Sequence, residues 1–310
     1  DVWYSTSYLL DRKQSMNGCA KKRFENYKQQ PLEFVFDKSF TGKLSQFGLD
    51  PNRRTPSGIK AAIIREKGTN GEREMAYMLY LAGFDVKDVT MTDLISGRET
   101  LEDINMVVYC GGFSNSDVLG SAKGWAGSFL FNPKAKAALD NFYAREDTLS
   151  LGVCNGCQLM MELGLITPED KKKGKMLHND SHKFESNFLG VTVPMNRSVM
   201  FGSLSGSKLG IWVAHGEGKF SLPYPEDHYN VVLKYSYDEY PGNPNGSDYS
   251  VAGIASQDGR HLAMMPHLER ACFPWNNAYY PLDRKEEDQI TPWMEAFVNA
   301  RKWVEANRKK

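Results

Sequence analysis

The sequence predicts an α/β fold, in which a doubly wound, mostly parallel sheet is flanked by helices and preceded by a short helical segment. Two observations support this prediction. Short apolar runs alternate with amphipathic runs from residue 59 to residue 154, and the last apolar run leads into a cysteine flanked by glycines. Such β-α-β alternation implies parallel strands joined by right-handed crossovers. The length of 310 residues suits one large or two modest globular domains.

The first part of the chain, residues 1–57, differs from the rest. It opens with an aromatic, helix-like stretch and closes with a polar stretch bracketed by Pro51 and Pro56, which has the composition of a linker. No separate hydrophobic core is evident in it. We therefore expect residues 1–57 to be the C-terminal end of another domain plus a tether, and residues 58–310 to form the main domain. Because Asp1 is not a natural start, we also expect a longer polypeptide.

Hydrophobic patterning gives the expected elements of the main domain in order. The expected strands of the parallel part are 59–64, 84–86, 106–110 and 149–153, with helices at 71–82 and 134–144. The later part is richer in strand signals, at 191–193, 210–214, 231–235, 251–256 and 261–265. A final helix begins near Pro292, and we interpret its apolar stripe as core packing. The stripe comprises Trp293, Phe297, Ala300 and Val304.

The most informative motif is a cysteine between two glycines at the end of a predicted strand. Gly152 and Gly156 stand two residues to either side of Cys154. A sharp turn from strand to helix crowds its backbone, so glycines at these positions indicate a nucleophile elbow. A cysteine there lies at a helix N-terminus, whose unpaired N–H groups favour the thiolate and can bind an oxyanion. The motif therefore predicts an acyl-transfer site with Cys154 as nucleophile.

A cysteine nucleophile needs a base, and the base needs a group that orients it. His267 and Glu269 follow a predicted strand, and residues two apart in an extended segment point the same way. We expect His267 to accept the Cys154 proton and later to protonate the leaving group, while Glu269 fixes the imidazole tautomer. Alone, such a pair is more often a surface ion pair. Its place after a strand, in one domain with the elbow, favours the catalytic interpretation.

Two consecutive glycines, Gly111 and Gly112, follow another predicted strand and would let the backbone approach a ligand closely. We assign the backbone amides of Gly112, Phe113 and Asn155 to an oxyanion hole. One such donor stabilises a transition state by roughly 3 kcal/mol. Taken alone, a glycine pair after a strand more often indicates an ordinary turn.

Other interpretations of the cysteines have less support. Cys154 and Cys157 have the spacing of a redox pair. However, redox motifs of this type open a helix early in their domain, whereas this pair follows several predicted β-α units. No second pair of this kind and no close histidine pair occurs in the sequence, so we expect no metal site. We interpret the remaining cysteines as buried small side chains: Cys19, Cys110, Cys157 and Cys272. Four histidines receive no role: His178, His182, His228 and His261.

Composition argues against several classes of function. Lys plus Arg and Asp plus Glu both number 38, so the zero formal net charge favours neither nucleic acid nor an anionic membrane. The basic run 171–175 is short and resembles a solvated loop. No apolar stretch approaches the roughly 18 residues of a membrane span. Five cysteines, an odd number, without a signal peptide predict free thiols in a reducing cytoplasm.

At this point the motifs resemble a known family, the class I glutamine amidotransferases. The segments 152–158 and 266–269 match that family's nucleophile and base motifs. Finer matches at 111–119, 212–218 and 265–270 resemble the glutaminase domains of large phosphoribosylformylglycinamidine synthases. The tail 292–302 is similar to theirs, and residues 6–9 resemble the end of their synthetase region. The resemblance therefore spans nearly the whole chain.

The resemblance implies a flavodoxin-like fold and a reaction. The domain would hydrolyse L-glutamine to glutamate and ammonia through a Cys-His-Glu triad and a thioester intermediate. The ammonia would serve the ATP-dependent conversion of formylglycinamide ribonucleotide to formylglycinamidine ribonucleotide in de novo purine biosynthesis. ATP and Mg²⁺ would bind in a separate synthetase domain of the same polypeptide. This chain would then need no cofactor, and its partners would be L-glutamine and that synthetase domain.

Three further site residues come from the resemblance alone. Gln158 matches the family position that contacts bound glutamine near the oxyanion loop. His215 and Glu217 match a signature associated with the glutamine pocket.

The chain departs from the family pattern in two places. Asn115-Ser116 stands where the family has Tyr-Gly, and Leu268 stands where a proline usually separates the His and the Glu. The first change would alter the flexibility of the loop or its coupling to a partner domain. The second frees the local backbone angle and leaves the triad intact. Two alternatives stay open: a thiol hydrolase of related fold that acts on another amide or ester, and a non-catalytic domain that packs on a partner.

Overall fold

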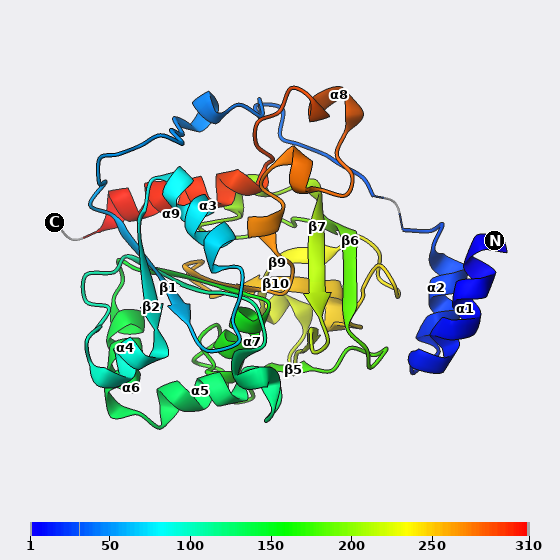
Figure 1. The fold of residues 1–310 in the computed structure, drawn as a ribbon, viewed down its shortest axis with the longest axis horizontal. Helices are drawn as coiled ribbons and strands as arrows, with labels where there is room; N and C mark the ends of the chain where they lie inside the picture. Colours follow the sequence, from blue (N-terminus) through cyan, green and yellow to red (C-terminus); the bar gives the residue numbers. More distant parts are fainter. Residues whose placement is uncertain (1, 31, 309–310) are drawn as a thin grey trace.

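The computed structural model describes residues 2–30 and 32–308, within which the chain forms nine α-helices and eleven β-strands. Figure 1 shows their arrangement. The helices are α1 Val2–Gln14, α2 Cys19–Asn26, α3 Glu72–Ala82, α4 Met91–Ser96, α5 Lys123–Leu130, α6 Pro133–Ala144, α7 Asn155–Glu162, α8 Leu282–Lys285 and α9 Trp293–Asn307. The strands are β1 Lys60–Arg65, β2 Asp85–Thr90, β3 Met106–Tyr109, β4 Leu149–Val153, β5 Lys175–Leu177, β6 Glu185–Thr192, β7 Lys208–His215, β8 Lys219–Ser221, β9 Asn230–Tyr235, β10 Val251–Ala255 and β11 His261–Met264.

One sheet of nine strands organises the molecule, in the order β2-β1-β3-β4-β11-β10-β9-β6-β7. The five strands from β2 to β11 run parallel. From β11 onward each neighbouring pair is antiparallel. The predicted α/β fold is confirmed, and the strand-rich later part of the sequence extends the parallel sheet at one edge. Strands β5 and β8 form a separate two-stranded ribbon.

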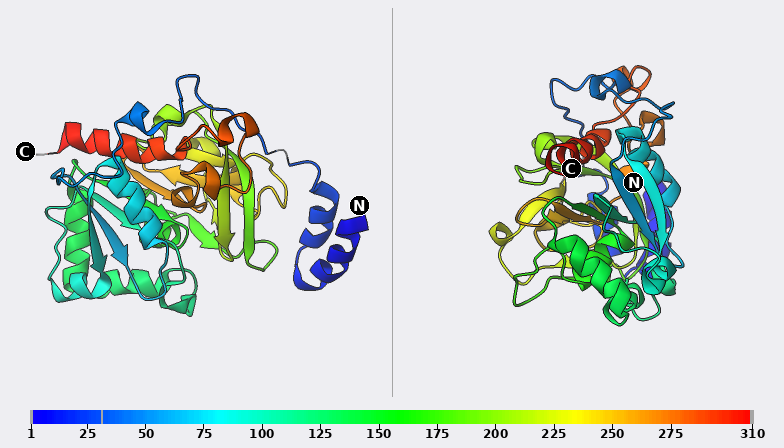
Figure 2. Two further views of the ribbon diagram at one scale, coloured as in Figure 1. Left: turned by 45° about the horizontal axis from the view of Figure 1, so that its top comes forward. Right: turned by 90° about the vertical axis from the view of Figure 1, so that its left-hand side faces the viewer.

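Helices cover both faces of the parallel part of the sheet, as a doubly wound fold requires (Figures 1 and 2). Helices α3 and α9 pack against each other on one face, while α4, α5, α6 and α7 form the other layer. Strands β3, β4 and β11 are buried along their whole length, which explains their continuous apolar runs. The predicted stripe of α9 is buried. Among the described residues, no helix combines the length and apolar character that crossing a bilayer demands.

Three helices of the main domain were not predicted from the sequence, and all three are short: α4, α5 and the four-residue α8. Helix α4 has six residues and α5 has eight. Helix α4 nevertheless carries a local start signal, because Thr90 and Asp93 form a capping box. The predicted strand 84–86 is longer than expected, since β2 continues to Thr90.

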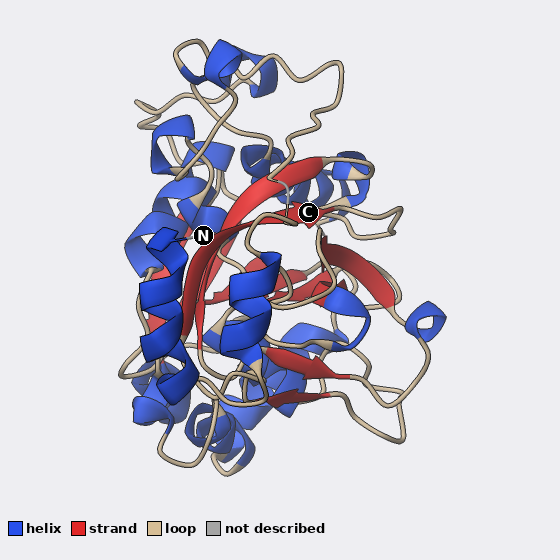
Figure 3. Cartoon of the chain, turned by 90° about the vertical axis from the view of Figure 1, so that its right-hand side faces the viewer, coloured by secondary structure: helices blue, strands red, loops and turns tan. Residues whose placement is uncertain are grey.

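The N-terminal helices α1 and α2 form a hairpin (Figure 3). The turn between them contacts the 178–185 segment, because the Met16 N–H donates to the Ser181 carbonyl oxygen at 2.9 Å. No residue of α1 is buried, whereas Cys19 and Ala20 of α2 are. Arg23 of α2 holds the hairpin in place through ion pairs of 2.8 Å with both Asp11 and Glu185.

Residues 33–49, which precede the predicted linker, lie along the main domain. Val35 and Lys208 exchange two backbone hydrogen bonds, of 2.8 and 3.1 Å, at the outer edge of β7. The Phe36 ring stacks on Tyr280 with 5.7 Å between ring centroids. The division into residues 1–57 and 58–310 stays a prediction.

Candidate active site

The chain turns sharply at Cys154, where β4 ends and α7 begins. Cys154 has φ 54° and ψ −108°, a conformation that non-glycine residues rarely adopt. A Cβ atom on Gly152 would lie 2.5 Å from the Gly156 carbonyl oxygen, and one on Gly156 would lie 2.0 Å from the Tyr109 carbonyl oxygen. The glycine spacing in the sequence therefore has the predicted cause: neither position has room for a side chain.

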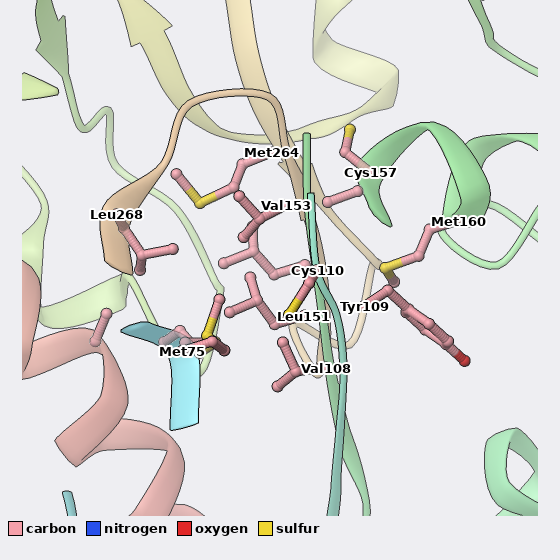
Figure 4. Close-up of a cluster of buried hydrophobic side chains, with 14 of the residues drawn as sticks. Met75, Val108, Tyr109, Cys110, Leu151, Val153, Cys157, Met160, Met264 and Leu268 are labelled. Atoms are coloured by element: carbon pink, nitrogen blue, oxygen red, sulfur yellow. The ribbon is translucent and has the colours of Figure 1, made fainter. Parts of the chain in front are cut away.

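Packing on both faces of the sheet holds this turn (Figure 4). Leu151 and Leu268 lie on one side, and Tyr109, Cys157 and Met160 lie on the other. Cys157 is completely buried and its burial raises the pKa of the thiol. Cys157 therefore packs in the core, as predicted. The other three cysteines predicted to be buried are also buried and unpaired: Cys19, Cys110 and Cys272.

A buried imidazole–carboxylate pair lies beside the turn. His267 Nδ1 is 2.6 Å from Glu269 Oε1, and both side chains are almost fully buried. The backbone N–H of His267 donates to the Trp212 carbonyl oxygen at 2.9 Å, which ties this loop to β7. The pair predicted from its spacing therefore forms, and it is not a surface ion pair.

Cys154 and His267 both pack against the backbone of Gly111. A Cβ atom on Gly111 would lie 2.8 Å from His267 Cε1 and 3.3 Å from Cys154 Cβ, so both side chains pack on the same backbone. Burial alone would lower the pKa of His267. The Glu269 carboxylate, the Cys154 sulfur and the hydrogen bonds of the ring to both raise that pKa to about 9. At neutral pH the imidazole is therefore protonated beside the sulfur.

Two of the three amides assigned to the oxyanion hole are free. The Phe113 N–H donates to the Gly68 carbonyl oxygen at 2.8 Å, so it is not available to an oxyanion in this conformation. The N–H groups of Gly112 and Asn155 meet no acceptor among the described residues. These two amides can still face a developing oxyanion.

The loop after Gly112 has an unusual backbone. Asn115, Ser116 and Asp117 have φ values of 52°, 57° and 48°, three consecutive residues in the left-handed region. This region strongly favours glycine. The family glycine that Ser116 replaces thus falls at a position that requires positive φ. Ser114, just before the run, donates its N–H to Asn155 Oδ1 at 2.9 Å.

Gln158 and Glu217 are connected, although not through the Glu217 carboxylate. Gln158 Nε2 donates to the Glu217 backbone carbonyl oxygen at 2.8 Å. The carboxylate accepts hydrogen bonds from the backbone and the hydroxyl of Ser121. It also faces a cavity of about 710 Å³ that Asp117 lines too. Burial raises the pKa of Asp117, and the charge of Glu217 adds to this shift.

His215 lies at the end of β7, close to the thiol. The carbonyl oxygen of Ala214, its neighbour, is 3.6 Å from Cys154 Sγ. Burial and the charge of His267 lower the pKa of His215 to about 3, so the ring is neutral. Neither ring nitrogen has a hydrogen-bond partner in the described part of the chain. Among described residues, no group of three or more His, Cys, Asp and Glu side chains could hold a metal ion.

Sequence reasoning missed two fully buried asparagines that support this region. Asn179 Nδ2 donates to the His215 carbonyl oxygen at 2.7 Å, and the Gly218 N–H donates to Asn179 Oδ1 at 3.0 Å. Asn245 donates to the Tyr235 hydroxyl at 2.9 Å. The only local signal for Asn245 is the turn-rich run 243–247, which predicts a loop without showing that the loop is buried.

Comparison with known proteins agrees with this geometry. A family model described as the CobB/CobQ-like glutamine amidotransferase domain matches residues 58–304. A probable phosphoribosylformylglycinamidine synthase of Arabidopsis thaliana, described as chloroplastic/mitochondrial, is 40% identical over 99% of this chain and 23% of its own length. The Homo sapiens phosphoribosylformylglycinamidine synthase is 40% identical over 98% of this chain and 24% of its own length. The chain thus spans about a quarter of these relatives.

Solved structures share the fold. PurLQS from Thermotoga maritima superposes with a TM-score of 0.59 and 27% identity, over 79% of this chain and 99% of that one. A GMP synthase protein from Thermoplasma acidophilum reaches a TM-score of 0.52 at 16% identity, over 82% of this chain and 96% of that one. The second likeness supports the fold alone.

Proposed function

The chain belongs to the family of CobB/CobQ-like glutamine amidotransferase domains, and from this we propose that it hydrolyses L-glutamine to glutamate and ammonia. Cys154 is the nucleophile, His267 the proton carrier and Glu269 the group that orients the imidazole. One observation carries the proposal: the glycine-flanked cysteine turn and the buried His267–Glu269 pair both pack on Gly111.

The first half of the reaction forms a thioester. The Cys154 sulfur attacks the carboxamide carbon of glutamine, and the carbonyl electron pair moves onto oxygen. The amides of Gly112 and Asn155 donate to that oxyanion. When the carbonyl reforms, the carbon–nitrogen bond breaks and the His267 imidazolium gives its proton to the departing nitrogen, which leaves as ammonia.

The second half releases glutamate. A water molecule attacks the thioester carbon and gives a proton to the now neutral His267. The carbon–sulfur bond breaks, glutamate departs and the imidazolium beside the Cys154 sulfur is restored. Glu269 stabilises the imidazolium in both halves and keeps Nε2 directed at the reacting atoms.

We place the released ammonia in a larger reaction. The relatives are phosphoribosylformylglycinamidine synthases about four times as long as this chain. We propose that a synthetase portion uses the ammonia to convert formylglycinamide ribonucleotide to formylglycinamidine ribonucleotide, with ATP and Mg²⁺ bound there. The five unpaired, buried cysteines suit a reducing compartment such as the cytoplasm.

Labelling with a glutamine-like electrophile tests the proposal. Intact-mass analysis should show one adduct, which Cys154→Ala abolishes and Cys157→Ala preserves. Ammonia release should be faster from glutamine than from asparagine, and simple esters should be poor substrates. Preferred turnover of an ester would favour a general thiol hydrolase. No adduct and no ammonia, with or without the synthetase portion, would leave only a non-catalytic packing role.

A further inference from the structure

The buried ring of His215 needs two hydrogen-bond partners that the described residues do not give it. The side chain is 2% exposed, and both Nδ1 and Nε2 are unpartnered. A neutral imidazole carries one N–H donor and one bare acceptor nitrogen, so the ring requires one acceptor and one donor nearby. A buried polar group left unpaired costs folding free energy, so the two unpaired nitrogens of this ring need a specific explanation.

Asn245 carries an unpartnered acceptor beside the ring, although the two side chains make no hydrogen bond to each other in this conformation. Its Nδ2 donates to the Tyr235 hydroxyl at 2.9 Å, while its Oδ1 is buried and has no partner among the described residues. Both Asn245 Oδ1 and His215 Nδ1 lie against Gly218: a Cβ atom there would be 2.9 Å from the first and 2.4 Å from the second. Any residue other than glycine at position 218 would therefore push the imidazole and the carboxamide apart.

We propose that Asn245 is a positioning residue that accepts a hydrogen bond from His215 Nδ1–H and so leaves His215 Nε2 as an acceptor for the side-chain carboxamide of bound glutamine. This inference rests on the proposed function for its ligand. The tautomer that it assigns to His215 is a property of the protein alone.

The surroundings of the ring support this assignment. The Ala214 carbonyl oxygen lies 3.6 Å from the Cys154 sulfur, and the charge of His267 lowers the pKa of the His215 ring, so strand β7 ends beside the reacting groups. Asn179 separately holds the backbone on either side of the ring, at the His215 carbonyl and the Gly218 N–H. The backbone of this turn therefore has its own support from Asn179, separate from the Asn245 carboxamide.

An acceptor at Nε2 distinguishes substrate from product. The carboxamide of glutamine has two N–H donors, whereas the carboxylate of glutamate has none. Glutamate would place its oxygen lone pairs against the lone pair of Nε2, and a site built to pair with a donor rejects a ligand that lacks one. His215 would thus help to select glutamine and to expel the glutamate formed.

Nitrogen NMR of the histidine side chains tests the tautomer directly. The unmodified chain, labelled with ¹⁵N-histidine, should show His215 protonated at Nδ1, with the signal identified by its loss in His215→Gln. In Asn245→Leu the proton should move wholly or partly to Nε2. Asn245→Asp keeps an acceptor and should keep Nδ1–H. Asn230→Leu removes another buried asparagine, at the start of β9, and should leave the His215 signal unchanged.

A His215 protonated at Nε2 in the unmodified chain would overturn the proposal, and so would an Asn245→Leu variant with an unchanged tautomer. The first result needs no Asn245 variant, so an Asn245 variant that fails to fold cannot hide the answer.

Kinetics of glutamine hydrolysis, measured with the synthetase portion present, give the second readout. Asn245→Leu should raise the KM for glutamine by roughly tenfold, as expected for one lost hydrogen bond, and change kcat much less. It should also strengthen inhibition by glutamate, whereas Asn230→Leu should do neither. A roughly tenfold fall in kcat with an unchanged KM would contradict the role in substrate selection. If no glutamine is hydrolysed at all while His215 carries Nδ1–H, the proposed function fails and the tautomer assignment stands.

Discussion

Asn155 Nδ2 lies 2.8 Å from Gln158 Oε1, so two side chains in the first turn of α7 fix each other's orientation. The same Asn155 side chain accepts the Ser114 N–H at 2.9 Å, and Gln158 donates to the Glu217 carbonyl oxygen at 2.8 Å. A chain of two carboxamides therefore connects the loop that carries the oxyanion amides to the turn that carries His215. Asn155 thus contributes a side chain to the site as well as the backbone amide predicted from the sequence.

Replacing Asn155 with Asp should break this connection while keeping the size of the side chain. The carboxylate can still accept from Ser114, but it would face Gln158 Oε1 without a donor. We expect kcat/KM for glutamine to fall roughly 10- to 100-fold, the range for a buried acceptor left unpaired. Steady-state kinetics and a melting curve measure this. Asn187→Asp, at an exposed position of β6, should have no effect. Equal activities for the two variants would contradict the prediction.

The pKa of His267 predicts an alkaline limit to the reaction. Because this pKa is raised to about 9, the imidazolium that protonates the leaving nitrogen is present below pH 9 and lost above it. The rate of glutamine hydrolysis should therefore fall as the pH rises through about 9. A histidine of ordinary pKa would lose its proton near pH 6.5. A pH–rate profile from roughly pH 6 to 10 measures the position of this limit.

Glu269→Gln provides the matched control for that profile. It removes the carboxylate that raises the pKa of His267 but keeps a hydrogen-bond acceptor for Nδ1. The alkaline limit should move to lower pH in this variant. A limit that stays where it is would show that another group titrates there.

Gly156→Ala should destabilise the fold, although alanine usually favours a helix. The new methyl group would lie 2.0 Å from the Tyr109 carbonyl oxygen, which is backbone and cannot rotate away. Overpacking of this kind costs about 1–3 kcal/mol. Denaturant unfolding measures the change. Gly202→Ala is the control, because its nearest neighbouring atom is 3.9 Å from the new Cβ. Similar stabilities for both variants would argue against a crowded turn.

Ser116→Gly should stabilise the loop. Ser116 has φ 57°, and a left-handed residue other than glycine costs about 1–2 kcal/mol. Glycine recovers that strain but loses more entropy on folding, so we expect a net gain of at most about 1 kcal/mol. Thermal unfolding measures it. Ser186→Gly, at an exposed strand position of β6, should instead lower stability. A loss of stability in Ser116→Gly would show that the serine is not strained.

The parallel half of the sheet could be predicted because each unit is encoded locally. The buried face of α3 and the apolar run of β4 both show in short windows of sequence. The antiparallel extension could not be predicted in the same way, because the pairing of β6 with both β7 and β9 depends on contacts between distant residues. Helix α4 is too short for its periodicity to show, although its Thr90–Asp93 cap is visible.

Within the site, residues with strong local motifs were found and those defined by distant neighbours were missed. The turn at Cys154 follows from its glycine spacing, and the His267–Glu269 pair follows from its spacing together with its place after a predicted strand. The Phe113 amide was assigned to the oxyanion hole, but whether it is free depends on the Gly68 carbonyl oxygen, which no local pattern reports. Asn245 was missed because asparagines in a turn-rich run are usually exposed.

Val35 gives the strand that carries His215 a backbone partner on its outer side. An uncovered strand edge is a template on which a second molecule can add a strand, and such addition leads to dimers, swapped segments or fibrils. Expression of residues 58–310 alone would expose the hydrogen-bonding groups of Lys208 at that edge. We therefore expect the segment that carries Val35 to protect this edge of the sheet against self-association.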